Sequence, residues 1–129
     1  EHNDCVAMAK QFADRTHFVH LRSCYIFPDG NFTEASHLGG RGHLIELCRI
    51  FEKAEQEGKC NSGRRLPMRV DHGMTFTDEP GGVFDESNHG HNAGYTLLGR
   101  MFAMGQIQGV IATVDDELGI EYKQPGFYD

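Results

Sequence analysis

Two short apolar runs in this sequence each end in a cluster of acidic, basic and imidazole side chains. The first run is His17-Phe-Val-His-Leu-Arg22, and the second ends in Arg69-Val-Asp-His72 immediately before Gly73. An acid and a histidine at the end of a strand can bind a metal ion and can transfer protons. The ends of these two runs are therefore the first candidates for a functional site.

Side-chain alternation predicts which of these residues face one another. In a strand, His20 and Arg22 share one face, and in the second strand Arg69 and Asp71 do so, while the apolar residues between them lie opposite. Charged groups are rarely buried without partners, so this cluster needs ion pairs, a metal or an anionic substrate. A simple ion pair of Arg22 or Arg69 with Asp71 would explain either strand alone. The two strands together, with His72 beside Asp71, favour a site.

The ligand types do not determine which metal ion would bind. Imidazole nitrogen and carboxylate oxygen suit manganese, iron and zinc alike. In the loop after the first strand, His37 is a candidate substrate contact, and a capping or solvent-exposed role is equally open. The four cysteines, at positions 5, 24, 48 and 60, fit neither a zinc pattern nor a compact disulfide framework, and free thiols are expected.

Hydrophobic periodicity and turn residues predict an alternation of helices and strands. We expect helices at 4–13, 43–57 and 95–113, strands at 17–23 and 66–71, loops at 25–38 and 74–92, a polar link at 59–65 and an acidic tail at 115–129. In the last helix one side is traced by Leu97, Leu98, Met101, Met104, Gln108 and Ile111. The alternation favours a parallel α/β architecture.

Composition excludes several classes of protein. The 129 residues carry a formal net charge of −7 with scattered Lys and Arg, so nucleic acid is not an expected partner. We find neither a long uncharged apolar run nor a signal-peptide pattern, and expect a soluble, cytoplasmic protein with no membrane partner.

The ordered motifs resemble the mannonate dehydratase family, lyases of hexuronate breakdown. The resemblance lies in His17–Arg22, Gly30-Asn-Phe-Thr-Glu34, His37-Leu-Gly39, Pro67–Gly73 and Asn92-Ala-Gly-Tyr95, followed by Gly99-Arg100. It implies a (β/α)8 TIM barrel, with chemistry at the C-terminal ends of its strands. A complete barrel needs ~250 residues, so residues 1–129 are expected to be the C-terminal segment of a single barrel domain.

The resemblance also implies the reaction and the roles. It is the dehydration of D-mannonate to 2-keto-3-deoxy-D-gluconate with Mn²⁺ or Fe²⁺. By resemblance, His20 and Asp71 match metal ligands, His72 and Tyr95 the proton-transfer pair, and Arg69 a substrate-site arginine. Arg22 and His37 are further substrate-binding candidates. Two alternatives remain: a metal-dependent sugar isomerase on a similar barrel, and a non-catalytic barrel fragment that associates with the rest of its barrel or with itself.

Overall fold

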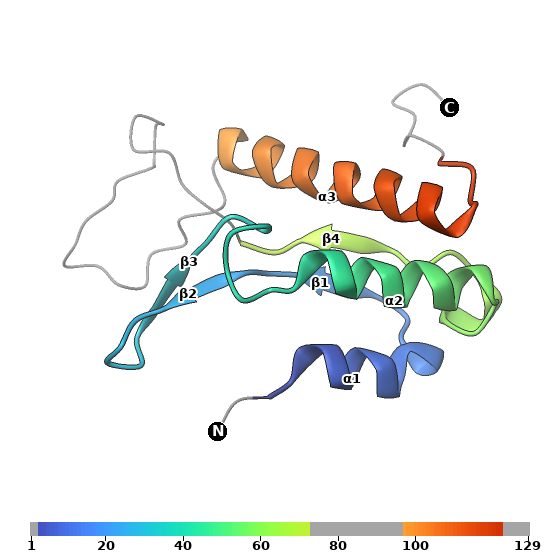
Figure 1. Cartoon of the computed structure of the whole chain (residues 1–129), viewed down its shortest axis with the longest axis horizontal. Helices are drawn as coiled ribbons and strands as arrows, with labels where there is room; N and C mark the ends of the chain where they lie inside the picture. The colour runs from blue at the N-terminus through green and yellow to red at the C-terminus, as the bar shows by residue number, and fades with distance from the viewer. Residues whose placement is uncertain (1–2, 73–96, 123–129) are drawn as a thin grey trace.

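The computed structural model of this protein describes residues 3–72 and 97–122. The elements in chain order are α1 (Cys5–Phe12), β1 (Val19–Leu21), β2 (Cys24–Ile26), β3 (Phe32–Glu34), α2 (Leu44–Gln56), β4 (Met68–Val70) and α3 (Leu97–Leu118), with short 3₁₀ turns at Ala13–Arg15 and Asn61–Gly63. In Figure 1, α2 lies between α1 and α3 and in front of β1 and β4, while β2 and β3 project to one side.

The parallel pair β1–β4 confirms the predicted parallel α/β arrangement, with strands shorter than expected. His20 is paired in register with Arg69, and Leu21 with Val70. Val19, Leu21 and Val70 are buried in the hydrophobic core, whereas His20 and Arg69 are exposed on the opposite face. The described part of the chain is therefore an α/β structure in which the apolar strand face packs on helices and the polar face is left open.

The segment 25–38, predicted as a loop, instead contains an antiparallel hairpin. β2 pairs with β3, and Cys24 lies opposite Glu34. The predicted turn is present between the strands, where Gly30 has a φ of 88°, a conformation that favours glycine. The flanking residues include aromatic and β-branched types that favour strands, and this signal was missed.

The first two helices follow the predicted starts closely. The Asp4 carboxylate accepts a hydrogen bond of 2.9 Å from the Ala7 N–H, so Asp4 is the N-cap of α1. The apolar side chains of α1 are only partly buried, because Met8 is 47% and Phe12 is 38% exposed. The buried side chains of α2 include Leu44, Cys48 and Phe51.

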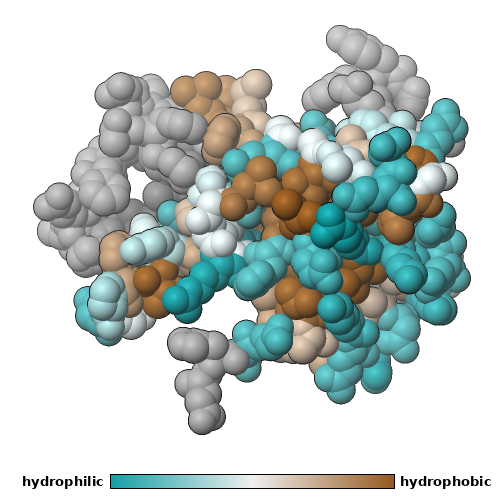
Figure 2. Space-filling view, viewed as in Figure 1, coloured by the Kyte–Doolittle hydropathy of each residue, from teal (hydrophilic) through white to brown (hydrophobic). Residues whose placement is uncertain are grey.

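α3 is longer than predicted and buries a different side. Its buried residues are Gly99, Ala103, Ile107, Val110, Val114 and Asp115. Leu97, Leu98, Met101 and Met104, on the side traced from the sequence, are 72%, 53%, 61% and 42% exposed. Figure 2 shows apolar atoms gathered over the first turns of this helix. The side traced from the sequence is thus not the buried side, because α3 is apolar around much of its circumference and periodicity does not select a face.

By length and composition alone, α3 could cross a membrane, with a mean hydropathy of 1.2 over an 18-residue window. An apolar helix that packs in the core of a protein satisfies the same criterion. In this structure α3 contacts both α2 and β4.

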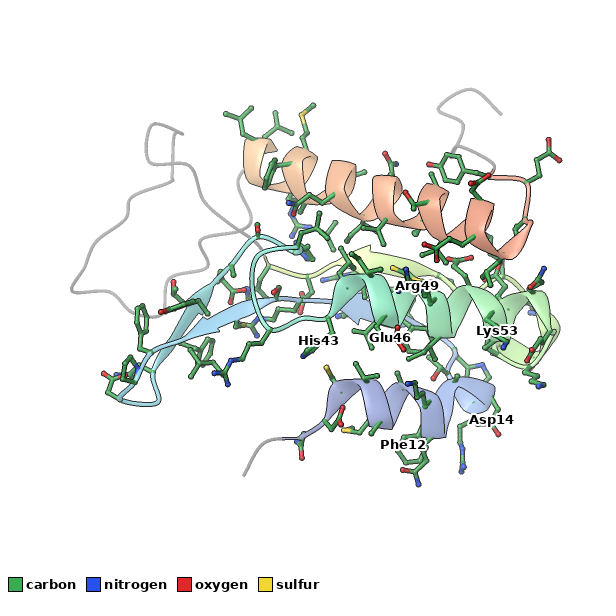
Figure 3. All side chains as sticks on the ribbon, viewed as in Figure 1. Phe12, Asp14, His43, Glu46, Arg49 and Lys53 are labelled. Carbon is green, nitrogen blue, oxygen red and sulfur yellow. The ribbon has the colours of Figure 1, made fainter. Side chains whose placement is uncertain are left out.

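The acidic segment 115–117, predicted to be solvated, is partly an interhelical element. Asp115 is 5% exposed, and burial raises its pKa. Burial, with neighbouring Asp115 and Glu55, also raises the pKa of Glu52 on α2 to about 7. Glu117 accepts two hydrogen bonds from Arg49 of α2, at 2.7 and 3.0 Å, and Figure 3 shows Arg49 on the side of α2 toward α3.

Candidate functional site

The polar cluster predicted from the two strand ends is assembled by the β1–β4 pairing. Parallel strands end at the same edge, so the residues after Leu21 and after Val70 emerge side by side. The Asp71 N–H donates a hydrogen bond of 2.9 Å to the Leu21 carbonyl and fixes the point where β4 ends. Sequence alternation was therefore sufficient to predict that the two clusters meet.

His20 and Asp71, the predicted metal ligands, lie side by side at this end of the strand pair. The His20 Nδ1 is 4.0 Å from an Asp71 carboxylate oxygen. Arg69 Nη2 lies 3.4 Å from the other Asp71 oxygen. Within residues 3–72 and 97–122, no three His, Cys, Asp or Glu side chains are grouped to hold a metal.

His72 sits between two carboxylates in an unusual backbone conformation. Its φ is 54°, in the left-handed region that non-glycine residues rarely adopt. Its Nε2 lies 4.0 Å from Asp71 and its Nδ1 lies 3.6 Å from Oε1 of Glu34. Backbone outliers of this kind are concentrated at functional sites, which supports a role for this residue.

Arg22 and Glu34 form a charge-assisted pair at the same end of β1 and β4. This end, with Arg22, Glu34, Asp71 and His72, is called the mouth below. The Arg22 Nε donates to Glu34 Oε2 at 3.2 Å, and its Nη2 donates to the other oxygen. This hydrogen bonding raises the pKa of the Arg22 guanidinium above its ordinary value. Arg22 was predicted to bind substrate, and the structure adds that its guanidinium is already engaged by a carboxylate.

Glu34 is the functional candidate that sequence reasoning missed. It was noted only as part of a motif, because the segment around it was taken for a loop. The alternation Phe32-Thr33-Glu34 was the available signal, since it predicts a short strand with residues 32 and 34 on one face. Its hairpin partner Cys24 has a pKa raised mainly by burial.

His37 is placed beneath the mouth rather than on the surface. Its ring is 2% exposed, and Nε2 is 2.7 Å from the Leu21 carbonyl. Because a carbonyl only accepts hydrogen bonds, Nε2 carries the proton. The His37 backbone N–H donates to the Gln106 side chain of α3 at 3.0 Å. His37 thus connects the end of β1 to α3. Tyr95, the second predicted proton-transfer residue, lies outside the described residues.

A cavity of about 730 Å³ beside β4 is a separate feature. It is lined by Arg69 of β4 and by α3 residues including Met104 and Ile107, but by none of His20, Asp71 and His72. The strand mouth, not this cavity, unites the residue types that proton transfer and metal binding require.

Comparison with known proteins agrees with the motifs at this mouth. Residues 1–120 match the family described as D-mannonate dehydratase (UxuA). Mannonate dehydratase 2 of Agrobacterium fabrum is 38% identical over 118 residues, which are 90% of this chain and 28% of that protein. The mannonate dehydratase of Saccharophagus degradans is 36% identical over 115 residues, 88% of this chain and 28% of its own.

The match covers nearly all of this chain but a small part of its relatives. The mannonate dehydratase of Brucella canis is 33% identical over 114 residues, or 88% of this chain and 26% of that protein. No solved structure matches the chain. The chain thus spans about 28% of the length of the first two relatives. Because the family match extends over residues 1–120, this chain belongs to the D-mannonate dehydratase family.

Proposed function

We propose that residues 1–129 are the C-terminal part of a metal-dependent D-mannonate dehydratase, folded as part of a (β/α)8 barrel. The observation that carries this proposal is the meeting of His20, Asp71 and His72 at one end of a parallel strand pair. That is the end at which barrel enzymes place their chemistry. The named relatives are mannonate dehydratases, which supports the choice of reaction.

The reaction requires removal of a weakly acidic C2 proton and departure of the C3 hydroxyl as water. His20 and Asp71 would hold a divalent metal, Mn²⁺ or Fe²⁺, which would supply Lewis acidity for this elimination. His72 and Tyr95 share the two proton transfers. An imidazole titrates close to neutral pH and can serve as either acid or base.

Arg69 is the residue best suited to bind the substrate carboxylate. Its guanidinium is about half exposed and lies at 3.4 Å from a single Asp71 oxygen. The Arg22 guanidinium, in contrast, already makes two hydrogen bonds to Glu34. Arginine binds carboxylates best through two parallel hydrogen bonds, so the less saturated Arg69 has the greater capacity for a sugar acid.

The rest of the barrel is the proposed partner of these residues. In the described part of the chain, β1 and β4 form a two-stranded sheet, so each leaves one edge unpaired. Exposed edges and apolar surfaces favour association. The exposed start of α3, with Leu97, Leu98 and Met101, adds apolar surface. Association with the remaining barrel, or with further copies, would cover both features. We place the complete enzyme in the cytoplasm.

The test is product formation by the complete polypeptide that contains these residues. Purified protein loaded with Mn²⁺ or Fe²⁺ should convert D-mannonate to a keto-deoxy acid, measured by a thiobarbituric-type assay. A metal-dependent sugar isomerase would interconvert aldose and ketose and give no keto-deoxy acid. Absence of product with both metals would refute the proposed reaction. Intact-mass analysis establishes whether the polypeptide assayed is the complete one.

A further inference from the structure

One carboxylate joins the ends of both parallel strands at the candidate site. Glu34 lies at the end of β3, and its side chain is only 9% exposed. Its carboxylate is hydrogen-bonded by Arg22, just after β1, and lies 3.6 Å from Nδ1 of His72, just after β4. The β2–β3 hairpin therefore does more than connect elements, since it brings a third acidic group to the mouth.

The pair with Arg22 fixes the direction of this carboxylate. A buried carboxylate needs compensation by hydrogen bonds or charge, and Arg22 supplies both with two N–H groups. Two parallel bonds hold the plane of the carboxylate as well as its position. Oε1 is thus presented to His72 by a carboxylate whose direction is set by Arg22.

The His72 ring is consequently flanked on its two nitrogen edges. Glu34 faces Nδ1 at 3.6 Å, and Asp71 faces Nε2 at 4.0 Å. A carboxylate at one nitrogen of a histidine fixes the ring orientation and leaves the other nitrogen for chemistry or coordination. The left-handed backbone of His72 needs such external contacts to persist.

We propose that Glu34 is a positioning residue that acts through His72: its carboxylate, 3.6 Å from Nδ1, sets the orientation of the ring and thereby aims Nε2 at the substrate side of the mouth. This proposal rests on the proposed dehydratase function. Glu34 itself does not touch the substrate, because its oxygens face Arg22 and His72.

The experiment is a double-mutant cycle in the complete, metal-loaded enzyme. Glu34→Gln is expected to lower kcat by about 10- to 100-fold, the scale reported for groups that orient a functional histidine. KM should change by less than about threefold, and the metal content should be unchanged. In a His72→Asn background, Glu34→Gln should cause little further loss, because the two residues act as one unit.

Glu117→Gln is the matched control. Glu117 makes the same two-bond pair, with Arg49, but between α2 and α3. Its loss should leave kcat unchanged, so a general effect of breaking an arginine pair is separated from an effect on His72. If Glu34→Gln does not fold, Glu34→Asp keeps a charge for Arg22 but withdraws the carboxylate from His72, and the same loss and non-additivity are expected.

The proposal would be overturned by an unchanged kcat, by an equal loss in the His72→Asn background, or by loss of metal, which would make Glu34 a ligand. Crystal structures of the wild type and Glu34→Gln give a measure that does not depend on activity. The His72 ring should leave its wild-type orientation in the variant, and an unmoved ring contradicts the proposal. A wild type that forms no keto-deoxy acid refutes the proposed function instead.

Discussion

His37 and Asp71 are connected through a single acceptor, the carbonyl oxygen of Leu21. The His37 ring donates to it from Nε2 at 2.7 Å, and the Asp71 N–H donates to it at 2.9 Å. The buried His37 ring and the backbone of Asp71, the candidate metal ligand, thus bind the same carbonyl oxygen. The position of Asp71 depends on this contact as well as on the strand ladder.

His37→Ala should therefore destabilise the protein. The change removes a hydrogen bond and a buried ring, and a loss of about 2 kcal/mol or more in the free energy of unfolding is expected. Urea unfolding of the complete polypeptide measures it. His17→Ala is the control, because His17 is exposed and makes one surface contact with Asn61. A higher KM at unchanged stability would instead identify His37 as a substrate contact.

Asp71→Asn should abolish metal-dependent turnover. The amide loses the negative charge that favours a divalent cation, so both the metal content and its Lewis acidity decrease. Metal analysis and the keto-deoxy acid assay check the two effects separately. Asp116→Asn, an exposed carboxylate on α3, is the control. Full activity in Asp71→Asn with metal still bound would contradict the assignment of Asp71 as a ligand.

His72→Asn should lower kcat by about 10²-fold or more, the usual scale for acid–base groups, and leave the metal in place. Tyr95→Phe should have the same effect. His43→Asn is a close control for the first change, because His43 also has a left-handed backbone, with a φ of 49°, and is exposed. Loss of metal in either variant would mean that the residue is a ligand.

The burial of Glu52, close to Asp115, should make stability depend on pH. The folded protein raises the pKa of Glu52 from 4.5 to about 7, so the folded state binds more protons than the unfolded state between these values. Its contribution to stability is greatest below pH 4.5 and is lost as the pH rises through about 7. The raised pKa of Asp115 changes the stability with pH in the same direction.

Urea midpoints at pH 5 and pH 7.5 test this dependence. They should fall with rising pH in the wild type and fall less in Glu52→Gln, which cannot ionise. Glu46→Gln removes an exposed carboxylate on the same helix and should retain the wild-type slope. An unchanged slope in Glu52→Gln would show that this carboxyl is not the source.

Residues 1–129 in isolation should be inactive and should not behave as a stable monomer. Among the described residues, only His20 and Asp71 form the predicted ligand pair, and apolar side chains at the start of α3 are exposed. Sedimentation and mannonate turnover with added Mn²⁺ check both statements. A monodisperse, cooperatively melting monomer would refute the first, and product formation would refute the second.

The local architecture was largely predictable because it follows from local patterns. Alternation at His20 and Arg69 assigned the polar face correctly, since period-two packing of strand residues is independent of the rest of the fold. The contact of Glu34 with His72 could not be predicted in the same way. It joins residues 38 positions apart through a hairpin, and non-local contacts of this kind leave no periodic trace.

The limits of prediction for α3 have a different origin. Both sides of this helix carry apolar residues, and burial was decided by the neighbours α2 and β4 rather than by the helix itself. Gly99 and Ala103 lie on the packed side together with Ile107 and Val110, while Leu98 and Met101 face outward. Neither the volume nor the hydrophobicity of these side chains alone distinguishes the two sides.

The left-handed backbone at His72 also limits β-pairing at the end of β4. A strand extends only while its residues keep an extended backbone, and a φ of 54° two residues after Val70 directs the chain out of that path. A neighbouring strand therefore cannot continue a regular hydrogen-bond ladder through His72. The rim of the sheet is kept free of β-pairing at the very residues whose side chains need room for a small molecule.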